Sequence, residues 1–185
     1  MKPRAPSFAY ARRRWLLGAA SLVAAPAVWA TSRVSTASDA RALAFEHLHT
    51  GETLSVVYAV GDRYVPESLG ALARLLRDHR TGDTHAIDPA LFDQLHALAN
   101  VTGAREPFCV ISGYRSPRTN AMLASRSSGV ATGSLHLEGR AIDIRLPGVP
   151  LADLREAALS LRAGGVGFYP ASDFVHIDTG RVRTW

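Results

Sequence analysis

Two histidines and one aspartate are the residues of this sequence best suited to hold a metal ion. His136 and Asp143 lie in the stretch S-L-H-L-E-G-R-A-I-D, and His176 follows later in F-V-H-I-D. Two imidazoles and one carboxylate leave a coordination position open on zinc, which distinguishes a catalytic zinc site from a closed structural one. A single His and Asp at this spacing often arise by chance, so the surrounding residues have to support the interpretation.

The residues around His136 and Asp143 predict how the two side chains are positioned. Gly139 interrupts the stretch, and the alternation in A-I-D-I-R-L predicts a strand after it. We therefore expect a loop with His136, a turn at Gly139 and a strand with Asp143. Ile142 and Ile144 would face the core, and Asp143 would face the opposite side, towards the site.

Two further aspartates accompany His176. On a strand, Phe174, His176 and Asp178 point to one face, so Asp178 could orient the imidazole or stand in the cleft itself. Asp173 precedes His176 by three residues, where a carboxylate could accept a proton from water activated by zinc. The H-x-D pair of His176 and Asp178 also occurs in non-haem iron oxygenases, but those enzymes need a distal histidine, and none follows Asp178.

Arg115 is the candidate cation of the site. It follows an apolar run at 108–112, predicted to be a short buried strand, and precedes a helix predicted at 117–126. Strand-to-helix turns often present functional side chains, and a guanidinium there could bind a carbonyl or carboxylate of a substrate. Alternatively, Arg115 is a surface arginine that pairs with an acid.

The rest of the chain predicts a scaffold of helices and short strands. Apolar periodicity and end signals predict helices at 66–80, from 88 onward and at 150–163, and strands at 53–60, 166–169 and 174–178. Because helices and strands do not alternate regularly, we expect an α+β domain with a mainly antiparallel sheet flanked by helices. The histidines at 79, 85 and 96 are expected at the surface, whereas those at 47 and 49 could approach the cleft.

The first 30 residues are typical of an export signal. Residues 1–14 are basic and contain no acid, and residues 15–30 are apolar or small, with Pro26 arguing against a membrane span. Arg12 to Arg14 favour a twin-arginine signal over an ordinary secretory one. Residues 31–40 are rich in Ser, Thr and Ala and are expected to be a flexible linker, which leaves one folded domain at 41–185.

Charge and cysteine content exclude some functions of the exported part. Five of the 21 basic residues lie in the signal, so 16 remain beside 16 acidic residues. This balance does not support binding to nucleic acid or to an acidic membrane. Cys109, the only cysteine, lies in the apolar run P-F-C-V-I-S and is expected to be a buried structural thiol.

Four longer motifs resemble the murein endopeptidase K family, within the zinc D-alanyl-D-alanine peptidase superfamily that shares its fold with the hedgehog domain. They are S-G-Y-R-S-P-x-T-N, S-x-H-x-x-G-x-A-x-D, G-G-V-G-x-Y-P and F-V-H-x-D-T-G-x-V-R-x-W, at 112–120, 134–143, 164–170 and 174–185. H-T-G-E at 49–52 and L-R-D-H-R-T-G at 76–82 are also similar. The resemblance covers nearly all of the expected domain.

The resemblance implies a zinc peptidase in the periplasm. It implies Zn²⁺ bound by His136, Asp143 and His176, with Arg115 polarising the scissile carbonyl or holding the substrate. In the same motifs, Ser134 and Tyr114 are implied as substrate-binding residues. Many members of the superfamily carry a glutamate as general base three residues before the last histidine. This chain has Asp173 there, so Asp173 is the first choice of base and Asp178 the second.

Peptidoglycan stem peptides or crosslinks are the implied substrate. A 3-3 crosslink, a 4-3 crosslink and a terminal D-Ala all remain open as the bond cut. No membrane span is expected once the signal is cleaved. Alternatively, the protein is a non-catalytic module that binds the cell wall or has a regulatory role. Such a module would keep zinc as a structural element. The replacement of the superfamily's glutamate by Asp173 favours that alternative, whereas the complete ligand set argues against it.

Overall fold

The computed structural model describes residues 39–126 and 131–185. The export signal expected at 1–30 and the linker expected at 31–40 lie outside the described residues, except for the last two linker positions. Ala40 already begins the first strand. The strands are β1 (Ala40–His47), β2 (Thr53–Val60), β3 (Arg63–Tyr64), β4 (Phe108–Ser112), β5 (Ala141–Arg145), β6 (Gly165–Tyr169), β7 (Phe174–Asp178) and β8 (Arg183–Thr184). The helices are α1 (Pro66–Leu75), α2 (Pro89–Thr102), α3 (Pro117–Arg126) and α4 (Leu151–Leu161), and two short 3-10 helices are η2 (Leu135–Glu138) and η3 (Pro170–Ser172).

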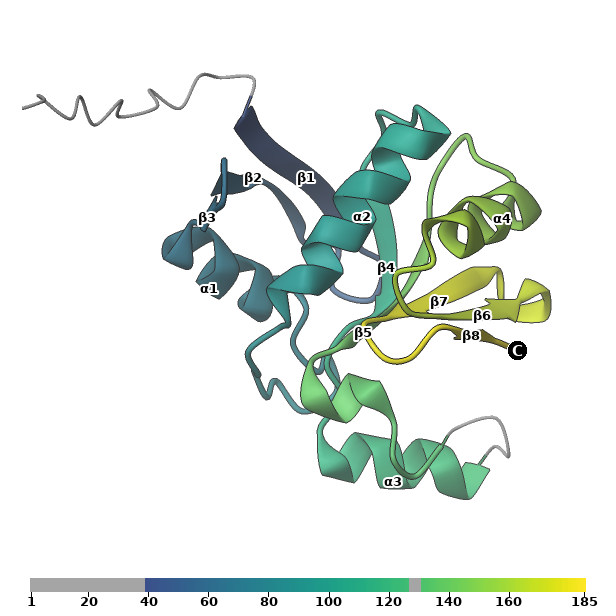
Figure 1. Cartoon of the computed structure of the whole chain (residues 1–185). Coiled ribbons are helices and arrows are strands. Elements are labelled where there is room, and N and C mark those ends of the chain that lie inside the picture. The colour runs from purple at the N-terminus through teal and green to yellow at the C-terminus, as the bar shows by residue number, and fades with distance from the viewer. Residues whose placement is uncertain (1–38, 127–130) are drawn as a thin grey trace, which may run out of the picture. The chain divides into compact units, whose positions relative to one another are not determined.

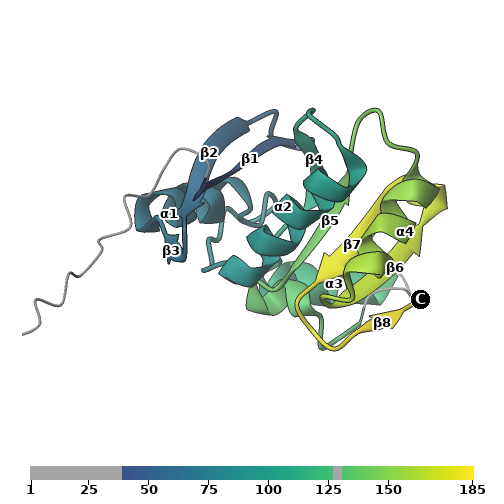
Figure 2. The same ribbon diagram turned by 45° about the horizontal axis from the view of Figure 1, so that its top comes forward.

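All strands within the described residues form one sheet, in the order β3-β2-β1-β4-β5-β7-β6-β8 (Figure 1). Only β1–β4 and β6–β8 are parallel pairs, and the other neighbours are antiparallel. Helix α1 packs against β2, α2 against β1, and α4 against β6 and β7, and α2 also contacts α4 (Figures 1 and 2). The predicted α+β class with a mainly antiparallel sheet is therefore confirmed.

The core lies between the sheet and helices α1, α2 and α4. Ile142 and Ile144 of β5 are fully buried in it, as the alternation predicted. Asp143 points to the other face of the sheet, because successive side chains of a strand alternate. Cys109 is buried and unpaired, as expected for a structural thiol. No helix among residues 39–126 and 131–185 is long and apolar enough to cross a membrane.

Helix α1 is shorter than the 66–80 predicted, because it ends at Leu75. The carboxylate of Asp78 explains the early end. It accepts hydrogen bonds from the backbone N–H of Arg80 (2.9 Å) and from the backbone N–H (2.9 Å) and hydroxyl (2.7 Å) of Ser116. The two long-range bonds from Ser116 hold Asp78 beside the start of α3. The sequence could not reveal them, since Ser116 lies 38 residues away.

Candidate metal centre

The register of the sheet places Asp143 and His176 side by side. They are direct partners across the antiparallel pair β5–β7, so their side chains share a face and start about 5 Å apart. Ser112 of β4 is the partner of Asp143 on the other side, and Gly167 of β6 is the partner of His176. The site thus lies on one row that crosses four strands.

A tight turn brings His136 to this row. Ser134 begins η2 by accepting a hydrogen bond from the backbone N–H of His136, and Gly139 ends it with φ 65°. A Cβ at Gly139 would overlap the carbonyl oxygen of Ala86, so both the backbone angle and the space require glycine. The loop with a turn at Gly139 was predicted, whereas the 3-10 geometry was not.

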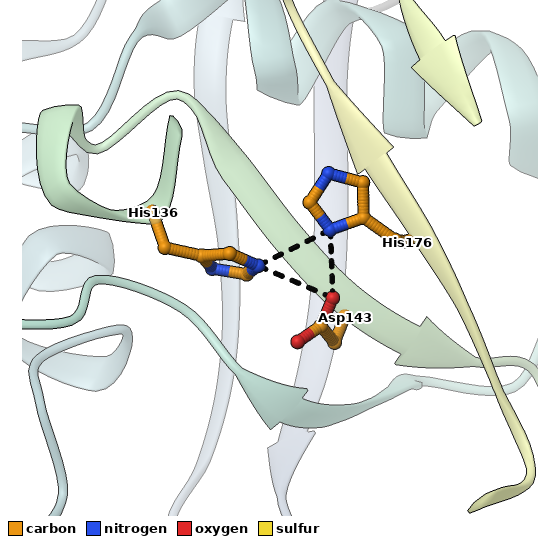
Figure 3. A group of neighbouring side chains, drawn as sticks. All are labelled: His136, Asp143 and His176. Carbon is orange, nitrogen blue, oxygen red and sulfur yellow. Dashed lines mark hydrogen bonds and ion pairs between the residues drawn. The ribbon is translucent and has the colours of Figure 1, made fainter. Parts of the chain in front are cut away.

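The three candidate ligands converge on one point. His136 Nε2 lies 3.2 Å from Asp143 Oδ1 and 3.2 Å from His176 Nδ1, and His176 Nδ1 lies 2.9 Å from Asp143 Oδ1 (Figure 3). All three side chains are buried. They are the one group of at least three histidine, cysteine or acidic side chains in the described part of the chain whose ligand atoms come this close.

The outer nitrogen of each imidazole is held by an acceptor. His136 Nδ1 donates to the carbonyl oxygen of Gly113 (2.6 Å), and His176 Nε2 donates to Asp178 Oδ2 (3.1 Å). In a neutral imidazole with its proton on the outer nitrogen, the inner nitrogen carries a lone pair. Two lone pairs and a carboxylate oxygen therefore face one another at about 3 Å. Such a triangle of acceptors is stable only around a cation or a proton.

The triangle fits zinc. Zinc bonds of about 2.0–2.1 Å in a tetrahedral arrangement separate neighbouring ligand atoms by roughly 3.3 Å, close to the observed separations. Burial opposes the ionisation of Asp143, but the imidazoles of His136 and His176 outweigh it and hold the pKa of this carboxyl well below the usual range. Burial lowers the pKa of His136, which favours the neutral imidazole that a metal requires. Burial also opposes protonation of His176, but the carboxylates of Asp143 and Asp178 outweigh it and raise the pKa of this imidazole, so a metal would displace a proton there.

Arg115 lies beside the triangle. Its NH2 group forms an ion pair with Asp143 Oδ2, the oxygen that does not face the histidines, and its Nε donates to Ser112 Oγ (2.9 Å). The backbone N–H of Arg115 also donates to the carbonyl oxygen of His136 (3.1 Å). In this structure the guanidinium thus holds a candidate ligand in place while it lines the cavity described below.

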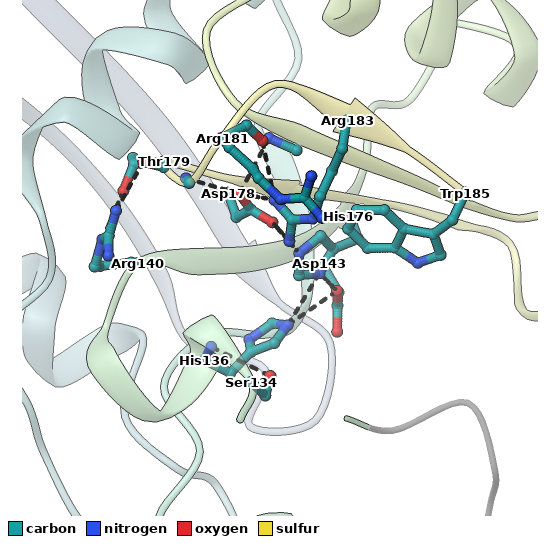
Figure 4. A network of polar contacts seen from close by, with 12 residues as sticks. Ser134, His136, Arg140, Asp143, His176, Asp178, Thr179, Arg181, Arg183 and Trp185 are labelled. Carbon is teal, nitrogen blue, oxygen red and sulfur yellow. Dashed lines mark hydrogen bonds and ion pairs between the residues drawn. The ribbon is translucent and has the colours of Figure 1, made fainter. Parts of the chain in front are cut away.

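The two aspartates suggested as general base lie in different surroundings. Asp178 is fully buried, and its carboxylate accepts from His176 and from Arg183 NH2 (2.6 Å) (Figure 4). The side chain of Asp173 is 61% exposed and pairs with Arg145 (2.5 Å). Neither aspartate lines the cavity, and Asp143 is the only acid among the described residues that do. The assignment of a general base stays a prediction.

A cavity of about 360 Å³ opens above the triangle. It is lined by Arg115, Ala131, Gly133, Ser134, Leu135, His136, Asp143, Tyr169, Phe174, His176, Arg183 and Trp185. Ser134, suggested for substrate binding, therefore lines the cavity. Tyr114, the other residue suggested for substrate binding, is buried against the core and stacks on the ring of His85, 4.9 Å between centroids, and does not line the cavity.

The aromatic side of the cavity is not among the site residues predicted from the sequence. Tyr169, Phe174 and Trp185 belong to the motifs G-x-Y-P and F-V-H-x-D-T-G-x-V-R-x-W, so the motifs contained the signal. The strand pattern also placed Phe174 on the face of His176. No spacing rule connects Trp185 to the site, because β8 reaches it only by pairing with β6.

His47 and His49, which could have approached the cleft, lie with His79 in a separate cluster. The rings of His49 and His79 stack at 4.1 Å, and the fully buried ring of His47 meets His79 edge-on at 5.6 Å. None of the three lines the cavity of the candidate metal centre. His79 is half-buried, not fully at the surface as expected.

Comparison with known proteins identifies close relatives. A family model described as "Peptidoglycan L,D-endopeptidase MepK" matches residues 35–185. The protein named "Peptidoglycan L,D-endopeptidase MepK" in Escherichia coli (strain K12) is 45% identical over 177 residues, which cover 95% of this chain and 97% of that protein. A "Probable peptidoglycan L,D-endopeptidase MepK" from Haemophilus influenzae is 47% identical over 146 residues, or 78% of each chain.

Proposed function

The chain belongs to the peptidoglycan L,D-endopeptidase MepK family, and from this premise we propose that it is a zinc peptidase that cuts crosslinks in peptidoglycan. An L,D-endopeptidase cuts a peptide bond between an L-centred and a D-centred residue. Among the crosslinks left open by the sequence, the bond between two diaminopimelate residues of a 3-3 crosslink has this stereochemistry. A 4-3 crosslink joins two D-centres and does not.

The observation that carries the proposal is the triangle of His136 Nε2, Asp143 Oδ1 and His176 Nδ1, with both imidazole protons held on the outer nitrogens. These atoms would hold Zn²⁺. Zinc bound there supplies Lewis-acid polarisation of the scissile carbonyl and a nucleophile at neutral pH. Three protein ligands leave room for a substrate atom, as a catalytic site requires.

The remaining side chains position the ligands and the substrate. Arg115 keeps Asp143 in place and presents its positive charge to the cavity, where it stabilises negative charge that develops on the substrate carbonyl. Ser134 orients η2 and lies within the same cavity. Asp178 fixes the tautomer of His176, as carboxylates commonly do for metal-bound imidazoles.

A periplasmic location follows from the substrate. The export signal at 1–30, with Arg12 to Arg14 as its twin-arginine element, would deliver the domain to the cell wall. N-terminal sequencing of the protein recovered from the periplasm tests this part, and a mature chain that begins close to residue 31 is the expected result. Retention of the full-length chain in the cytoplasm would contradict it.

Digestion of purified sacculi tests the activity. Mass spectrometry of the released muropeptides should show loss of 3-3 crosslinked dimers with zinc, and no loss with a chelator or with His136→Ala. Thermal unfolding of His136→Ala verifies that the variant is folded. Loss of 4-3 dimers instead would refute the L,D assignment.

A second candidate function, a non-catalytic wall-binding module, is favoured by one observation. Asp143 is the only acid among the described cavity residues, so none of these residues offers a second carboxylate as proton acceptor. Unchanged muropeptides after incubation with the folded, zinc-loaded protein, together with its retention on sacculi, would support this function over hydrolysis.

A further inference from the structure

The end of the chain forms part of the cavity wall. β8 runs parallel beside β6, and the backbone N–H of Trp185 donates to the carbonyl oxygen of Val166 (3.3 Å). In return, Phe168 N–H donates to the carbonyl oxygen of Trp185 (3.0 Å). Between them lies Gly167, where a Cβ would come within 2.7 Å of the indole. The absence of a side chain at Gly167 therefore creates the space that the indole occupies.

The indole of Trp185 is held on several sides. Its Nε1 donates to the hydroxyl of Tyr169 (2.7 Å). Its ring lies 5.2 Å from that of His176, and Figure 4 shows these two side chains next to each other. The guanidinium of Arg183 lies over the indole, 4.7 Å from its centroid, and is fixed in turn by Asp178. Asp178 also accepts a hydrogen bond from His176. Trp185, Arg183, Asp178 and the candidate ligand His176 are therefore linked to one another by a closed set of contacts.

Despite these contacts, Trp185 is 48% exposed. Tyr169 and Phe174, whose rings stack 4.6 Å apart, lie on the same side of the cavity, and we call these three residues the aromatic wall. A large aromatic side chain that is rigidly held yet open to a cavity is suited to binding, because it offers apolar area at a low cost in conformational entropy.

We propose that the aromatic wall is the subsite that binds the methylene-rich side chain of the stem-peptide residue next to the scissile bond. This inference rests on the proposed peptidase function and adds the residues that select the substrate. The methylene groups would pack on the exposed faces of Trp185 and Tyr169. In a 3-3 crosslink, a diaminopimelate residue with such a chain flanks the bond on each side.

Distance favours the peptide over the glycan as the group in contact with Trp185. The indole lies 5.2 Å from the His176 ring, whereas one residue of extended peptide spans about 3.3–3.6 Å. A group that touches Trp185 while the scissile carbonyl lies at the triangle therefore belongs to the first or second residue from the cut. The sugars are farther along the stem.

Tryptophan content makes the subsite directly observable. The chain has three tryptophans, Trp15, Trp29 and Trp185, of which the first two lie in the expected signal. Full-length protein with Trp15→Phe and Trp29→Phe would emit from Trp185 alone. Mixing of the zinc-loaded protein with purified 3-3 crosslinked muropeptide dimer in a stopped-flow instrument should change this emission before cleavage, with an amplitude that saturates with dimer concentration. Peptide-free glycan chains should leave it unchanged.

The emission measurement and the hydrolysis assay separate the subsite from the proposed function. Hydrolysis of the dimer by zinc-loaded protein without any emission change would overturn the subsite, as would a change caused by peptide-free glycan. An emission change without hydrolysis would overturn the proposed function and keep the subsite. Absence of both would overturn both.

Substitution at Trp185 provides the second test, with Val182→Ala as matched control. Val182 lies in the same terminal segment, is 54% exposed and does not line the cavity. Trp185→Ala should raise KM for the dimer about 10- to 30-fold, as for truncation of a central binding residue, while kcat changes less than about threefold. Trp185→Phe keeps an aromatic face, so its KM should lie between those of the wild type and Trp185→Ala. The KM of Val182→Ala should match that of the wild type.

Zinc affinity distinguishes substrate binding from support of His176. Trp185→Ala should keep the zinc affinity of the wild type within about threefold. If zinc affinity and kcat fall together while KM stays constant, Trp185 acts only by positioning His176, and the subsite is refuted. Thermal unfolding of each variant verifies that a loss does not come from an unfolded chain.

Discussion

The substitution Asp178→Asn tests the link between the tautomer of His176 and metal binding. Oδ1 accepts from the backbone N–H of Gly165 (3.0 Å), the backbone N–H of Gly180 (2.8 Å) and Arg183, and Oδ2 accepts from Arg183 and His176 Nε2. An asparagine has one carbonyl oxygen and one NH₂ group. The oxygen keeps more bonds at the position of Oδ1, so the NH₂ group would face His176.

This arrangement favours the other tautomer of the His176 imidazole. An NH₂ donor opposite Nε2 requires a lone pair there, so the proton of a neutral ring moves to Nδ1, the atom that faces Asp143 Oδ1 and His136 Nε2. A metal must then displace that proton. Loss of a carboxylate partner of a metal-bound imidazole costs about 10- to 100-fold in metal affinity, or about 1.4–2.7 kcal/mol.

Stability should fall as well. Arg183 loses its buried partner, which lowers the free energy of unfolding. Because the side chain of Arg183 is 29% exposed, water can partly replace that partner. We therefore expect a decrease of about 2 kcal/mol, within the range for an unsatisfied buried donor. For a chain of this length that corresponds to a decrease in Tm of about 4–8 °C. The assays are zinc competition against a chromophoric chelator and thermal unfolding of the metal-free protein.

Asp173→Asn is the matched control, because it removes a carboxylate from the other end of β7. Its pair with Arg145 is exposed and contributes at most about 1 kcal/mol, so zinc affinity and Tm should stay close to wild type. Wild-type zinc affinity in Asp178→Asn would refute the tautomer argument. A loss of activity of about 100-fold or more in Asp173→Asn, with zinc affinity intact, would instead identify Asp173 as the general base.

Three further predictions concern the turn, the metal and pH. Gly139→Ala should lower Tm and weaken zinc binding, because the methyl group overlaps the carbonyl of Ala86 and a left-handed φ disfavours alanine; unchanged Tm by calorimetry would contradict this. Zinc should raise the Tm of the wild type in a concentration-dependent way but not that of Asp143→Asn, since a ligand that binds only the folded state stabilises it. Burial, aided by the nearby charges of Arg80 and the neighbouring histidines, lowers the pKa of His79 to about 4 in the folded state, against about 6.5 in the unfolded state. As the pH decreases, the unfolded state therefore binds the proton first, and the free energy of unfolding should fall between pH 6.5 and pH 4. His79→Gln should make that fall shallower in denaturant titrations, and an identical pH profile would refute the assignment.

Local patterns of the sequence were sufficient for most elements of the fold. The alternation A-I-D-I-R-L predicted β5 with Ile142 and Ile144 in the core, because burial on one face of a strand imposes a period of two. Asp88 and Pro89 predicted the start of α2, where the carboxylate of Asp88 accepts from Ala90 N–H (3.0 Å). These signals act between residues that are neighbours in the chain.

The length of α1 and the boundary of β1 required the tertiary structure. Asp78 leaves the expected helix because it binds Ser116, the residue directly before α3. The strand β1 was not among the strands predicted from the sequence, and it forms because it pairs with β2 on one side and β4 on the other. Tertiary hydrogen bonds thus override weak local preferences at both places.

For the site, the sequence by itself determined the chemical inventory: two imidazoles, a carboxylate and an arginine, each on a segment whose local structure it also predicted. It could not determine which atoms of these side chains meet. Asp143 and His176 become neighbours through the register of β5 and β7, and Asp178 selects which imidazole nitrogen faces Asp143. The wall formed by Trp185 likewise depends on the pairing of β8 with β6. Strand register and hydrogen-bond direction involve residues far apart in the chain, so only the folded structure decides them.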